Sequence, residues 1–498
     1  MPVFEPGATG SEQLKADVAM SMRNAIKLGA SLLGTWAVAL GVRIYLPRHL
    51  GPSEFGVFNF ADGFTTAVYI VGSLGLETYI GKEVTTRIDH ASDFFGGTLL
   101  LRLLLSAVVT VVAVFGLHAG GKTDAVIQLV LLMAAAQVLF NINGAHAALL
   151  QAAGTVDGLS VLNISSKLFW AVAIAVSLAM GGGVLSVATA MLISEFLRTV
   201  GLIYLSRRLV KLRFRWDKSA TIAVVVASAP YYVASLAQTV YSRIDVSVMS
   251  FLTTDAEVGW YGSASNIAGM SLLLAPLIGW VLLPLTSRAA ARSADELAIV
   301  SRRAMELILT IAFPISLALF LGADLIVPTV FGKAFSPAIS SLRILAPLFI
   351  FTYAAMVGGT MLVRLGRGWA LTWISLGGMI VTPLLNVWLI PIFGHRFGDG
   401  GAGIAAATAL MVSEVLTTAI MTYMLGGMAF DRRSVIVVLK TVASCVAVGL
   451  LDWFLRPMAW GRLAIDAGVY IALVVTIGAV NIRETMQQMK RMRSGAAA

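Results

Sequence analysis

The chain has 498 residues, of which 58% are hydrophobic and 12% are charged, whereas about 25% of the residues in a soluble domain are charged. Its single cysteine, Cys445, excludes a disulfide framework and a cysteine-based metal site. The net charge of +10 would suit a nucleic-acid partner, but the distribution of the positive residues along the chain argues against one.

Residues 1–24 are expected to form a cytoplasmic N-terminal segment. They contain Glu5, Glu12 and Asp17 and lack a short apolar run before a small-residue cleavage site, so they do not resemble a signal peptide. From residue 25 onward, hydrophobic runs of about 20 residues recur, a length that crosses about 30 Å of hydrocarbon. We count fourteen runs, centred near residues 36, 67, 106, 137, 170, 194, 233, 270, 313, 350, 381, 415, 445 and 472. The sequence therefore predicts an all-α integral membrane protein with about fourteen transmembrane helices.

Two sequence patterns occur twice, which indicates that a membrane domain of about six helices was duplicated. The pattern Glu-x-Gly-x-Phe/Tyr-x2-Ala begins at Glu54 and again at Glu257. The pattern Thr-Ala-x3-Ser-Glu-x-Leu-x-Thr-x4-Tyr begins at Thr189 and again at Thr408. Folds built from such repeats place a substrate site between the two halves, near the bilayer midplane, so the duplication points to a transporter.

The repeats define the expected domains. The first lobe covers residues 25–206 and the second covers 220–427, with six spans each, and a basic cytoplasmic linker at 207–219 joins them. Since six spans return the chain to the same side, the lobes run in the same direction and are related by a parallel pseudo-twofold axis. Residues 428–482 add two C-terminal helices, and 483–498 form a basic cytoplasmic tail.

The positive residues set the expected orientation. With the N-terminus inside, about 23 of the 36 Lys and Arg residues fall in cytoplasmic segments and about 6 fall in outside loops. Such a bias orients membrane proteins. We therefore expect a multi-pass protein in contact with membrane lipid, with its N- and C-termini in the cytoplasm.

Polar residues follow one face of the second predicted span. They are spaced by three or four positions: Asn59, Asp62, Thr66, Tyr69, Ser73 and Glu77. On a continuous helix this spacing gives a polar stripe about 27 Å long. A charge at the centre of a lipid-facing helix costs at least about 2.5–3.5 kcal/mol, so the stripe is expected to line a wet cavity. Hydrogen bonding between helices is the alternative role.

Cations within the predicted spans outnumber anions once pairs such as Glu195 with Arg198 are discounted, and an internal salt bridge is the alternative role of that pair. A cationic cavity suits an anionic substrate, since Arg and Lys are the usual phosphate binders. The residues expected to bind the substrate are Arg43, Arg102, Lys167, Arg198 and Arg243. Asp62, Asp245 and Glu77 are the candidates for coupling to H⁺ or Na⁺, and neither a cofactor, a metal site nor a catalytic constellation is expected.

Several segments in a fixed order and spacing carry a family resemblance. They are Arg243-Ile-Asp245-x6-Leu252-x4-Glu257-x-Gly259-x-Tyr261, Pro284, Phe331-Gly332-x3-Ser336-Pro337-Ala338, Asn386-x2-Leu389-Ile390-Pro391-x2-Gly394 and Gly401-Ala402-x5-Thr408-x4-Ser413-Glu414. They resemble the polysaccharide transporter family, which consists of lipid-linked oligosaccharide flippases. Its superfamily also contains multidrug exporters and lipid II flippases. The resemblance covers about residues 22–427.

The resemblance implies two six-helix lobes that form a V around a central cavity, which opens to each side in turn. It also implies that an undecaprenyl-diphosphate-linked oligosaccharide repeat unit is moved to the periplasmic leaflet and that cationic residues hold the diphosphate. We therefore expect a flippase, and not an enzyme, in the bacterial inner membrane. It would serve exopolysaccharide or O-antigen-type polysaccharide biosynthesis by ion-coupled alternating access. A polysaccharide polymerase and glycosyltransferases of the same pathway are the expected partner proteins.

Three other functions are compatible with parts of the sequence. A lipid II flippase would use the same fold and a similar headgroup. A drug/cation antiporter of the same superfamily would require a net anionic, aromatic-rich cavity, against which the excess of cations argues. A membrane glycan polymerase or ligase would require a sizeable outside loop with catalytic residues, and no outside loop in the predicted topology exceeds about 15 residues.

Overall fold

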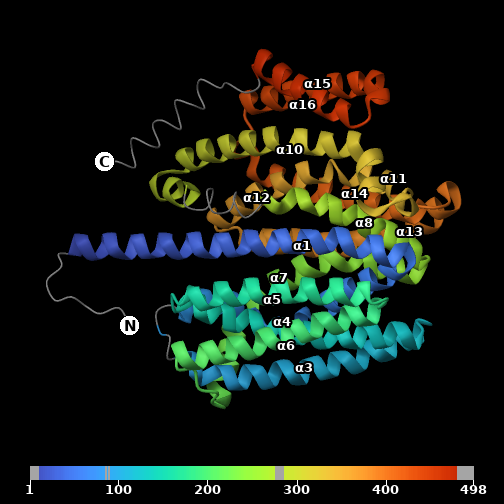
Figure 1. The fold of residues 1–498 in the computed structure, drawn as a ribbon. Coiled ribbons are helices and arrows are strands. Elements are labelled where there is room, and N and C mark those ends of the chain that lie inside the picture. Colours follow the sequence, from blue (N-terminus) through green and yellow to red (C-terminus); the bar gives the residue numbers. More distant parts are fainter. Residues whose placement is uncertain (1–9, 85–86, 88–89, 275–284, 479–498) are drawn as a thin grey trace. The chain divides into compact units, whose positions relative to one another are not determined.

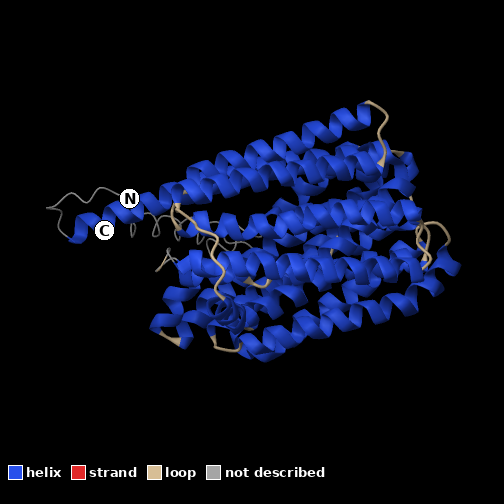
Figure 2. Cartoon of the chain, turned by 90° about the horizontal axis from the view of Figure 1, so that it is seen from below, coloured by secondary structure: helices blue, strands red, loops and turns tan. Residues whose placement is uncertain are grey.

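The computed structural model of the protein describes residues 10–84, 87, 90–274 and 285–478. These residues form helices joined by short loops (Figure 1), and no strand occurs among them (Figure 2). Packing divides the chain into two compact units. Unit 1 consists of Met1–Leu50 with Val57–Ser247, and unit 2 consists of Gly51–Gly56 with Val248–Ala498. This division follows packing, and the lobe boundaries expected from the repeats stay predictions.

Unit 1 is built around α4, which packs against α2, α3, α5 and α6. The elements of the unit are most of α1 (Gly10–Tyr69), η1 (Ile70–Ser73), α2 (Leu76–Glu83), α3 (Ala91–Ala119), α4 (Asp124–Ala152), α5 (Val156–Ala179), α6 (Val184–Leu209) and most of α7 (Lys218–Leu252). α6 also packs against α5, so α4, α5 and α6 form a layer of neighbouring helices. α7 contains Pro230 and bends by 45° shortly after it, as expected where a proline removes a backbone hydrogen bond.

The second predicted span is not one helix. α1 turns at Gly51, whose φ of 74° and ψ of 174° suit glycine, and the helix then ends at Tyr69. Gly75 takes a positive φ of 66°, and α2 starts at Leu76 with a bend of 44°. The expectation of one uninterrupted helical face over residues 59–77 is therefore wrong, because the chain changes direction within it.

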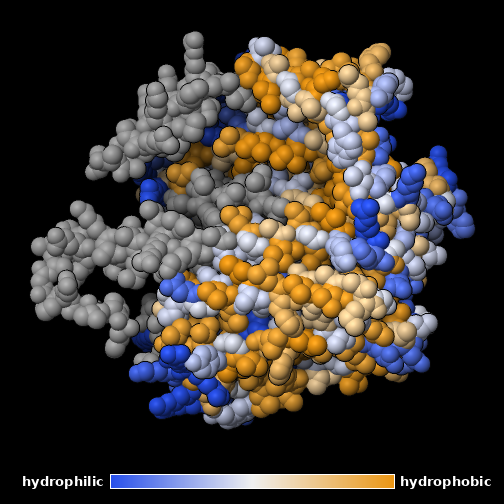
Figure 3. Space-filling model, in the orientation of Figure 1, coloured by the Kyte–Doolittle hydropathy of each residue, from blue (hydrophilic) through white to orange (hydrophobic). Residues whose placement is uncertain are grey.

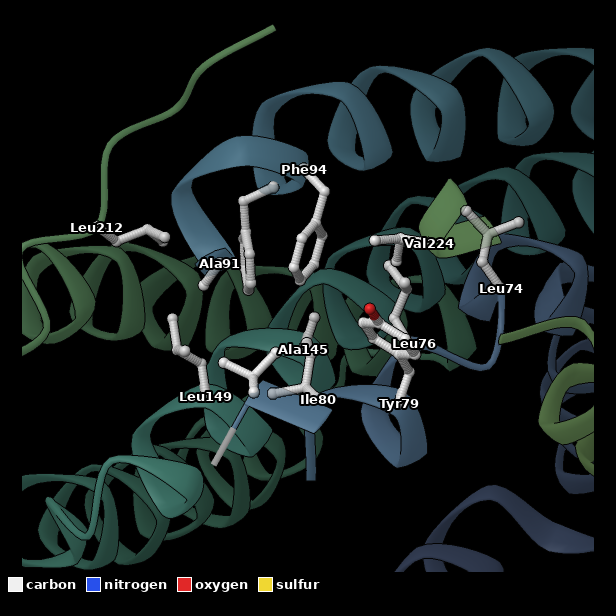
Figure 4. Close-up of a cluster of buried hydrophobic side chains, with 12 residues drawn as sticks. Leu74, Leu76, Tyr79, Ile80, Ala91, Phe94, Ala145, Leu149, Leu212 and Val224 are labelled. Carbon is white, nitrogen blue, oxygen red and sulfur yellow. The ribbon is translucent and has the colours of Figure 1, made fainter. Parts of the chain in front are cut away.

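A cluster of apolar side chains fixes this break at one end of unit 1 (Figure 4). Its buried members come from the segment after α1, from α3, α4 and α7, and from the linker: Leu74, Leu76, Tyr79, Ile80, Val84, Ala91, Phe94, Phe95, Ala145, Leu149, Leu212 and Val224. Seven of these twelve are 0–1% exposed. Their packing holds α2 against α4 and limits how far the bend in this part of the chain can vary.

The basic linker packs on unit 1. Leu212 is 4% exposed within the apolar cluster, and the backbone N–H of Arg213 donates to Ser92 Oγ at 3.1 Å. Asp217 precedes α7, and its carboxylate accepts the backbone N–H of Ala220 at 3.1 Å. Hydrogen bonds from this N–H and from the adjacent serine hold the pKa of Asp217 below its ordinary value. The start of α7 is thus capped at neutral pH.

Unit 2 is built around α14, which packs against α8, α11, α12 and α13. Its elements are α8 (Asp255–Met270), η4 (Ser271–Leu274), α10 (Ala294–Phe331), η5 (Lys333–Phe335), α11 (Ala338–Leu345), α12 (Leu348–Arg364), α13 (Gly368–Phe397), α14 (Gly401–Leu425), η6 (Gly426–Met428), α15 (Arg432–Leu455), η7 (Arg456–Met458) and α16 (Trp460–Thr476). α15 and α16 pack against each other and against α10. The two C-terminal helices that the sequence adds to the repeats are therefore attached through α10.

The described helices define a multi-pass membrane protein, although fewer of them qualify as spans than the sequence predicts. In the described residues nine helices are long and apolar enough to cross a membrane, or up to eleven if each of two bent pairs is one span. Two predicted spans share α1, and α8 and α16 have only 16 and 17 residues, fewer than the roughly 20 of a typical span. The eighth predicted span also extends into residues 275–284, outside the described part. Fourteen spans stay a prediction.

The surface agrees with a membrane environment. On the face shown in Figure 3, hydrophobic side chains cover the sides of the helices and hydrophilic ones gather toward helix ends. Exposed aromatic residues include Trp369, Trp373 and Trp388 on α13 and Trp453 and Phe454 on α15, all at least 65% exposed. Large exposed apolar surfaces of this kind are unfavourable in water and are expected where lipid covers the protein.

The duplicated glycines Gly56 and Gly259 meet backbone to backbone within unit 2. A Cβ atom on Gly56 would overlap the carbonyl group of Asp255 and would lie 2.9 Å from the amide nitrogen of Gly259. A Cβ atom on Gly259 would overlap the carbonyl oxygen of Pro52 and would lie 3.1 Å from the amide nitrogen of Gly56. Each copy of the repeat thus contributes the same position to one contact that leaves no room for a side chain.

Glu257, from the same duplicated pattern, caps a neighbouring helix. Its carboxylate accepts the backbone N–H of Gly400 at 2.6 Å and that of Gly403 at 3.3 Å, at the start of α14. Its counterpart Glu54 is exposed. The first N–H groups of a helix have no partner within the helix, and a carboxylate also suits the positive end of the helix dipole.

Replacing Glu257 by alanine is expected to lower the free energy of unfolding by about 1–3 kcal/mol, because buried N–H groups lose their acceptor. Glu257→Gln, which keeps one acceptor oxygen, is expected to lose less. Thermal unfolding of the purified protein in detergent measures both effects. Glu54→Ala is the matched control and should change the stability by at most about 0.5 kcal/mol. Equal losses at the two positions would contradict the capping role.

Candidate functional site

The predicted cationic residues come together in unit 1. Arg43 lies on α1 before the turn at Gly51 and Asp62 lies after it. The guanidinium of Arg243 on α7 lies 3.8 Å from the carboxylate of Asp62, and Arg43 interacts electrostatically with both of these residues. One carboxylate therefore pairs with Arg243 and attracts Arg43 electrostatically.

Lys167 on α5 connects this group to α6. It interacts electrostatically with Glu195 and Arg198 on α6 and with Arg43 and Asp62 on α1. Its ammonium group also lies over the ring of Trp170, 4.1 Å from the ring centroid, a favourable cation–π geometry. The ring of Trp170 therefore stabilises the position of the Lys167 ammonium group.

Glu195 and Arg198 form the internal ion pair that was the alternative prediction for them. The two side chains are 3.6 Å apart and each is about 20% exposed. Asn143 donates to Glu195 Oε2 at 2.8 Å, and Arg198 donates to Asn163 Oδ1 at 3.0 Å. The pairing leaves other donors of the arginine available, since a guanidinium carries five N–H groups.

Glu77 lies in the first turn of α2 and lines a partly open pocket of about 400 Å³ in unit 1. The cavity is lined by Glu77, Thr78, Phe140, Gly144, Ala147, Ala148, Gln151 and Arg198. Glu77 interacts electrostatically with Arg102 and Arg198. The volume lies within the range of about 300–1,000 Å³ that is usual for small-molecule pockets.

Gly144 on α4 leaves the room that the Glu77 carboxylate occupies, because a Cβ atom there would overlap Glu77 Oε1. Gly144→Ala is therefore expected to displace this carboxylate from the cavity wall and to reduce transport. The free energy of unfolding should change by less than about 1 kcal/mol, since a flexible side chain can yield and alanine favours the helix. Export assays and thermal unfolding measure the two effects. Gly116→Ala on α3, where the added atom meets open space, is the control and should leave transport unchanged.

Arg102 on α3 has a different position from the other predicted cations. It is 3% exposed, and its guanidinium donates to the carbonyl oxygens of Ser73 at 2.6 Å and Asn141 at 2.8 Å. Asn141 in turn donates to the carbonyl oxygen of Tyr69 at 2.8 Å. The bonds to Ser73 and Tyr69 satisfy carbonyls at the break after α1, as buried backbone groups require. The bond to Asn141 ties Arg102 to α4. Arg102 therefore positions the break in this conformation.

The six residues of the predicted stripe have different environments. Asn59, Tyr69 and Ser73 are 8%, 1% and 9% exposed, and Tyr69 shares a hydrogen bond of 2.6 Å with Thr110 on α3. Asp62 and Thr66 are partly exposed, and Glu77 is exposed. The buried three fit the alternative of hydrogen bonding between helices, whereas Asp62 and Glu77 face other charged groups. Whether the stripe lines a wet cavity stays a prediction.

Asp245, the other candidate for ion coupling, is 5% exposed on α7. Its Oδ1 accepts the backbone N–H of Val246 at 2.8 Å.

The other predicted charged residues fall into two adjoining groups in unit 1. One group contains Glu77, Arg102 and Arg198, and the other contains Asp62, Lys167 and Arg243.

We call the eight linked residues the charged cluster: Arg43, Asp62, Glu77, Arg102, Lys167, Glu195, Arg198 and Arg243. Five cations and three carboxylates give the cluster a net charge of +2. Sequence reasoning missed the amides that orient it, Asn143 and Asn163. Their polar side chains inside apolar runs were the available signal. Among the described residues, no group of His, Cys, Asp and Glu could hold a metal ion.

Charged networks among apolar helices are typical of membrane transporters. The chain belongs to the Polysaccharide biosynthesis protein family, whose model matches residues 21–290. Its relatives are transporters and flippases and not enzymes, so the family resemblance found in the sequence is confirmed.

Three known proteins show how far the similarity extends. The probable low-salt glycan biosynthesis flippase Agl15 of Haloferax volcanii is 23% identical, over 93% of this chain and 97% of its own. The lipid II flippase MurJ in an inward closed conformation is 14% identical with a TM-score of 0.70, over 92% of this chain and 98% of its own. An inward-facing multidrug resistance MATE family transporter is 16% identical with a TM-score of 0.64, over 81% of this chain and 98% of its own. The similarity to these two structures shows that the chain shares their fold.

Proposed function

We propose that the protein is a flippase for a lipid-linked glycan of polysaccharide biosynthesis. Its substrate would be an undecaprenyl-diphosphate-linked oligosaccharide repeat unit, which it moves across the bacterial inner membrane by ion-coupled alternating access. The family, the similarity to a probable glycan biosynthesis flippase and the fold support the transport of a glycan lipid. The observation that carries the proposal is the net positive charged cluster inside unit 1.

The charged cluster has the chemistry that a diphosphate requires. Arg43, Lys167, Arg198 and Arg243 each retain N–H donors beyond those used in pairing, and guanidinium groups bind phosphate oxygens in a bidentate manner. The net charge of +2 attracts an anion in a low-dielectric environment, where charge interactions are strong. Arg102 acts as a positioning residue, because backbone carbonyls occupy its guanidinium.

The carboxylates give the cluster a means of coupling. Asp62 lies 3.8 Å from Arg243 and interacts electrostatically with Arg43. If Asp62 loses its charge by binding H⁺, or if Na⁺ compensates that charge, the two arginines attract a diphosphate more strongly. Glu77 stands in the same relation to Arg198. Asp245 remains the third candidate in this proposal. Export would thus depend on the protonation state or ion occupancy of these carboxylates.

The lipid II flippase remains the second candidate, since the fold matches MurJ over nearly its whole length and lipid II presents the same diphosphate. The net positive charge disfavours an antiporter of drug cations. Short connections between the described helices disfavour a polymerase or ligase.

Complementation separates the candidates. The protein is expressed in one strain that lacks its repeat-unit exporter and in another that depends on a regulated lipid II flippase. We expect polysaccharide at the cell surface of the first strain and no growth rescue of the second. Arg243→Ala with Lys167→Ala should lose the rescue at normal abundance in the membrane. Rescue of the second strain alone would refute the proposed substrate in favour of lipid II.

A further inference from the structure

Unit 2 contains a second charged network, which the proposed transport mechanism does not use. It joins α10 and α11 to the hairpin of α15 and α16. Arg462 on α16 donates to Asp324 on α10 at 2.6 Å and to the carbonyl oxygen of Leu321 at 2.9 Å. Arg343 on α11 lies 3.8 Å from Asp324, and Arg462 Nε lies 3.3 Å from Asp452 Oδ1 on α15.

Asp466 completes the network from α16. It follows Arg462 by four residues, so the two side chains emerge on the same face of the helix. Its carboxylate lies within hydrogen-bonding reach of the carboxylate of Asp452 and interacts electrostatically with Arg462. Asp452 and Asp466 are each 5% exposed and Arg462 is 3% exposed. Two buried carboxylates therefore face each other behind one arginine.

The oxygens of Asp466 have no donor. In the part of the chain that the structure describes, neither carboxylate oxygen of Asp466 has a hydrogen-bond partner, although both are shielded from solvent. A carboxylate without protons only accepts hydrogen bonds, so two such groups cannot bond to each other. Leaving a buried charged group unsatisfied costs several kcal/mol. The carboxylate of Asp466 therefore requires a hydrogen-bond donor.

The net charge of the network also indicates that one proton is bound. With every group ionised, three carboxylates (Asp324, Asp452 and Asp466) face two guanidinium groups (Arg343 and Arg462), which leaves a net charge of −1. One bound proton makes the network neutral and supplies the single O–H that the facing carboxylates lack. Like charges in contact are known to share a proton in this way.

We propose that Asp452 and Asp466 form a proton-binding site in which one proton, taken from solvent, is shared between the two carboxylates. The site is separate from the charged cluster of unit 1 and does not depend on the identity of the transported glycan. Its occupant is a proton and not a metal cation in this proposal, because one shared O–H joins an oxygen of each carboxylate and neutralises the network. The proton lets Arg462 hold the α15–α16 hairpin against α10 with no charge left uncompensated.

Infrared spectroscopy of the purified full-length protein tests the site directly. A protonated carboxyl group gives a C=O band that shifts in D2O, and the wild type is expected to show this band at neutral pH and to lose it in alkaline buffer. Asp466→Asn, whose amide can donate to Asp452, should fold and should lack one carboxyl equivalent of the band. Asp452→Asn is the second variant, with the same expected loss. Asp295→Asn, an exposed position at the start of α10, is the control and should retain the full band.

Thermal unfolding gives a second measurement. The wild type should unfold at lower temperature as the pH rises through the loss of the proton, and Asp466→Asn should show a smaller dependence on pH. Absence of a protonated carboxyl band from the wild type at neutral pH would overturn the proposal. So would stabilisation by sodium chloride, but not by choline chloride, with the band missing, since this pattern would identify a sodium site.

Discussion

Replacing Gly259 by alanine is expected to abolish the folded protein or to reduce its stability by about 3 kcal/mol or more. The added methyl group would overlap the carbonyl oxygen of Pro52, and backbone atoms cannot turn aside as a side chain can. Overpacking of a tight contact generally costs about 1–3 kcal/mol, and more where backbone must move. The amount of full-length protein in the membrane and its unfolding temperature in detergent measure the effect. Gly56→Ala should have a similar effect, because Gly56 contributes the other side of the contact.

Two glycine positions provide controls for this experiment. Gly269→Ala lies on the same helix as Gly259, and Gly377→Ala lies on α13, and an added Cβ meets nothing within 4 Å at either position. Both variants should accumulate as the wild type does. Normal abundance and stability of Gly259→Ala would show that the close approach of the two duplicated segments is not required for folding.

Asp62→Asn is expected to reduce glycan export by more than about tenfold while leaving insertion and abundance normal. The substitution removes the charge of a carboxylate that lies 3.8 Å from Arg243 and that interacts electrostatically with Arg43. Both partners in this pair are about one-third exposed, so the loss in folding stability should stay at or below about 1 kcal/mol. Transport is affected more strongly, since a tenfold change needs only about 1.4 kcal/mol of differential binding.

Quantitative export assays in the complemented strain, with protein amounts measured by immunoblotting, test this expectation. Asp124→Asn, an exposed carboxylate at the start of α4, is the matched control and should export as the wild type does. Export at wild-type level by Asp62→Asn would remove Asp62 from the mechanism. The double variant Asp62→Arg with Arg243→Asp, which restores the pair with reversed charges, shows whether position or charge matters at each residue.

Much of this architecture is predictable from the sequence because hydrophobic length and repetition are strong signals. The apolar runs locate nearly all of the helices, and the duplicated patterns lead to the contact between Gly56 and Gly259. The break between Tyr69 and Leu76 was missed. It depends on tertiary partners, namely the donors of Arg102 and Asn141, and nothing local except glycine marks it. Helical periodicity continues through such a break in the sequence, although the chain turns.

The candidate site was predicted in part. A count of cations inside apolar runs selects Arg43, Lys167, Arg198 and Arg243, and the structure brings them together with Asp62. Their binding role stays a prediction. The network of Asp452, Arg462 and Asp466 was missed, because these residues lie near the ends of apolar runs, where charges are ordinarily assumed to reach water. Burial at such places follows from packing between helices and cannot be inferred from position along the chain.

The role of Arg102 at the helix break has a consequence for how this protein can evolve. A lysine carries the same charge, but its single ammonium nitrogen cannot replace a rigid planar fork whose two nitrogens reach two carbonyl oxygens. At this position the shape of the side chain therefore matters as well as its charge. Residue 102 should therefore remain an arginine for as long as the chain keeps the break between Tyr69 and Leu76.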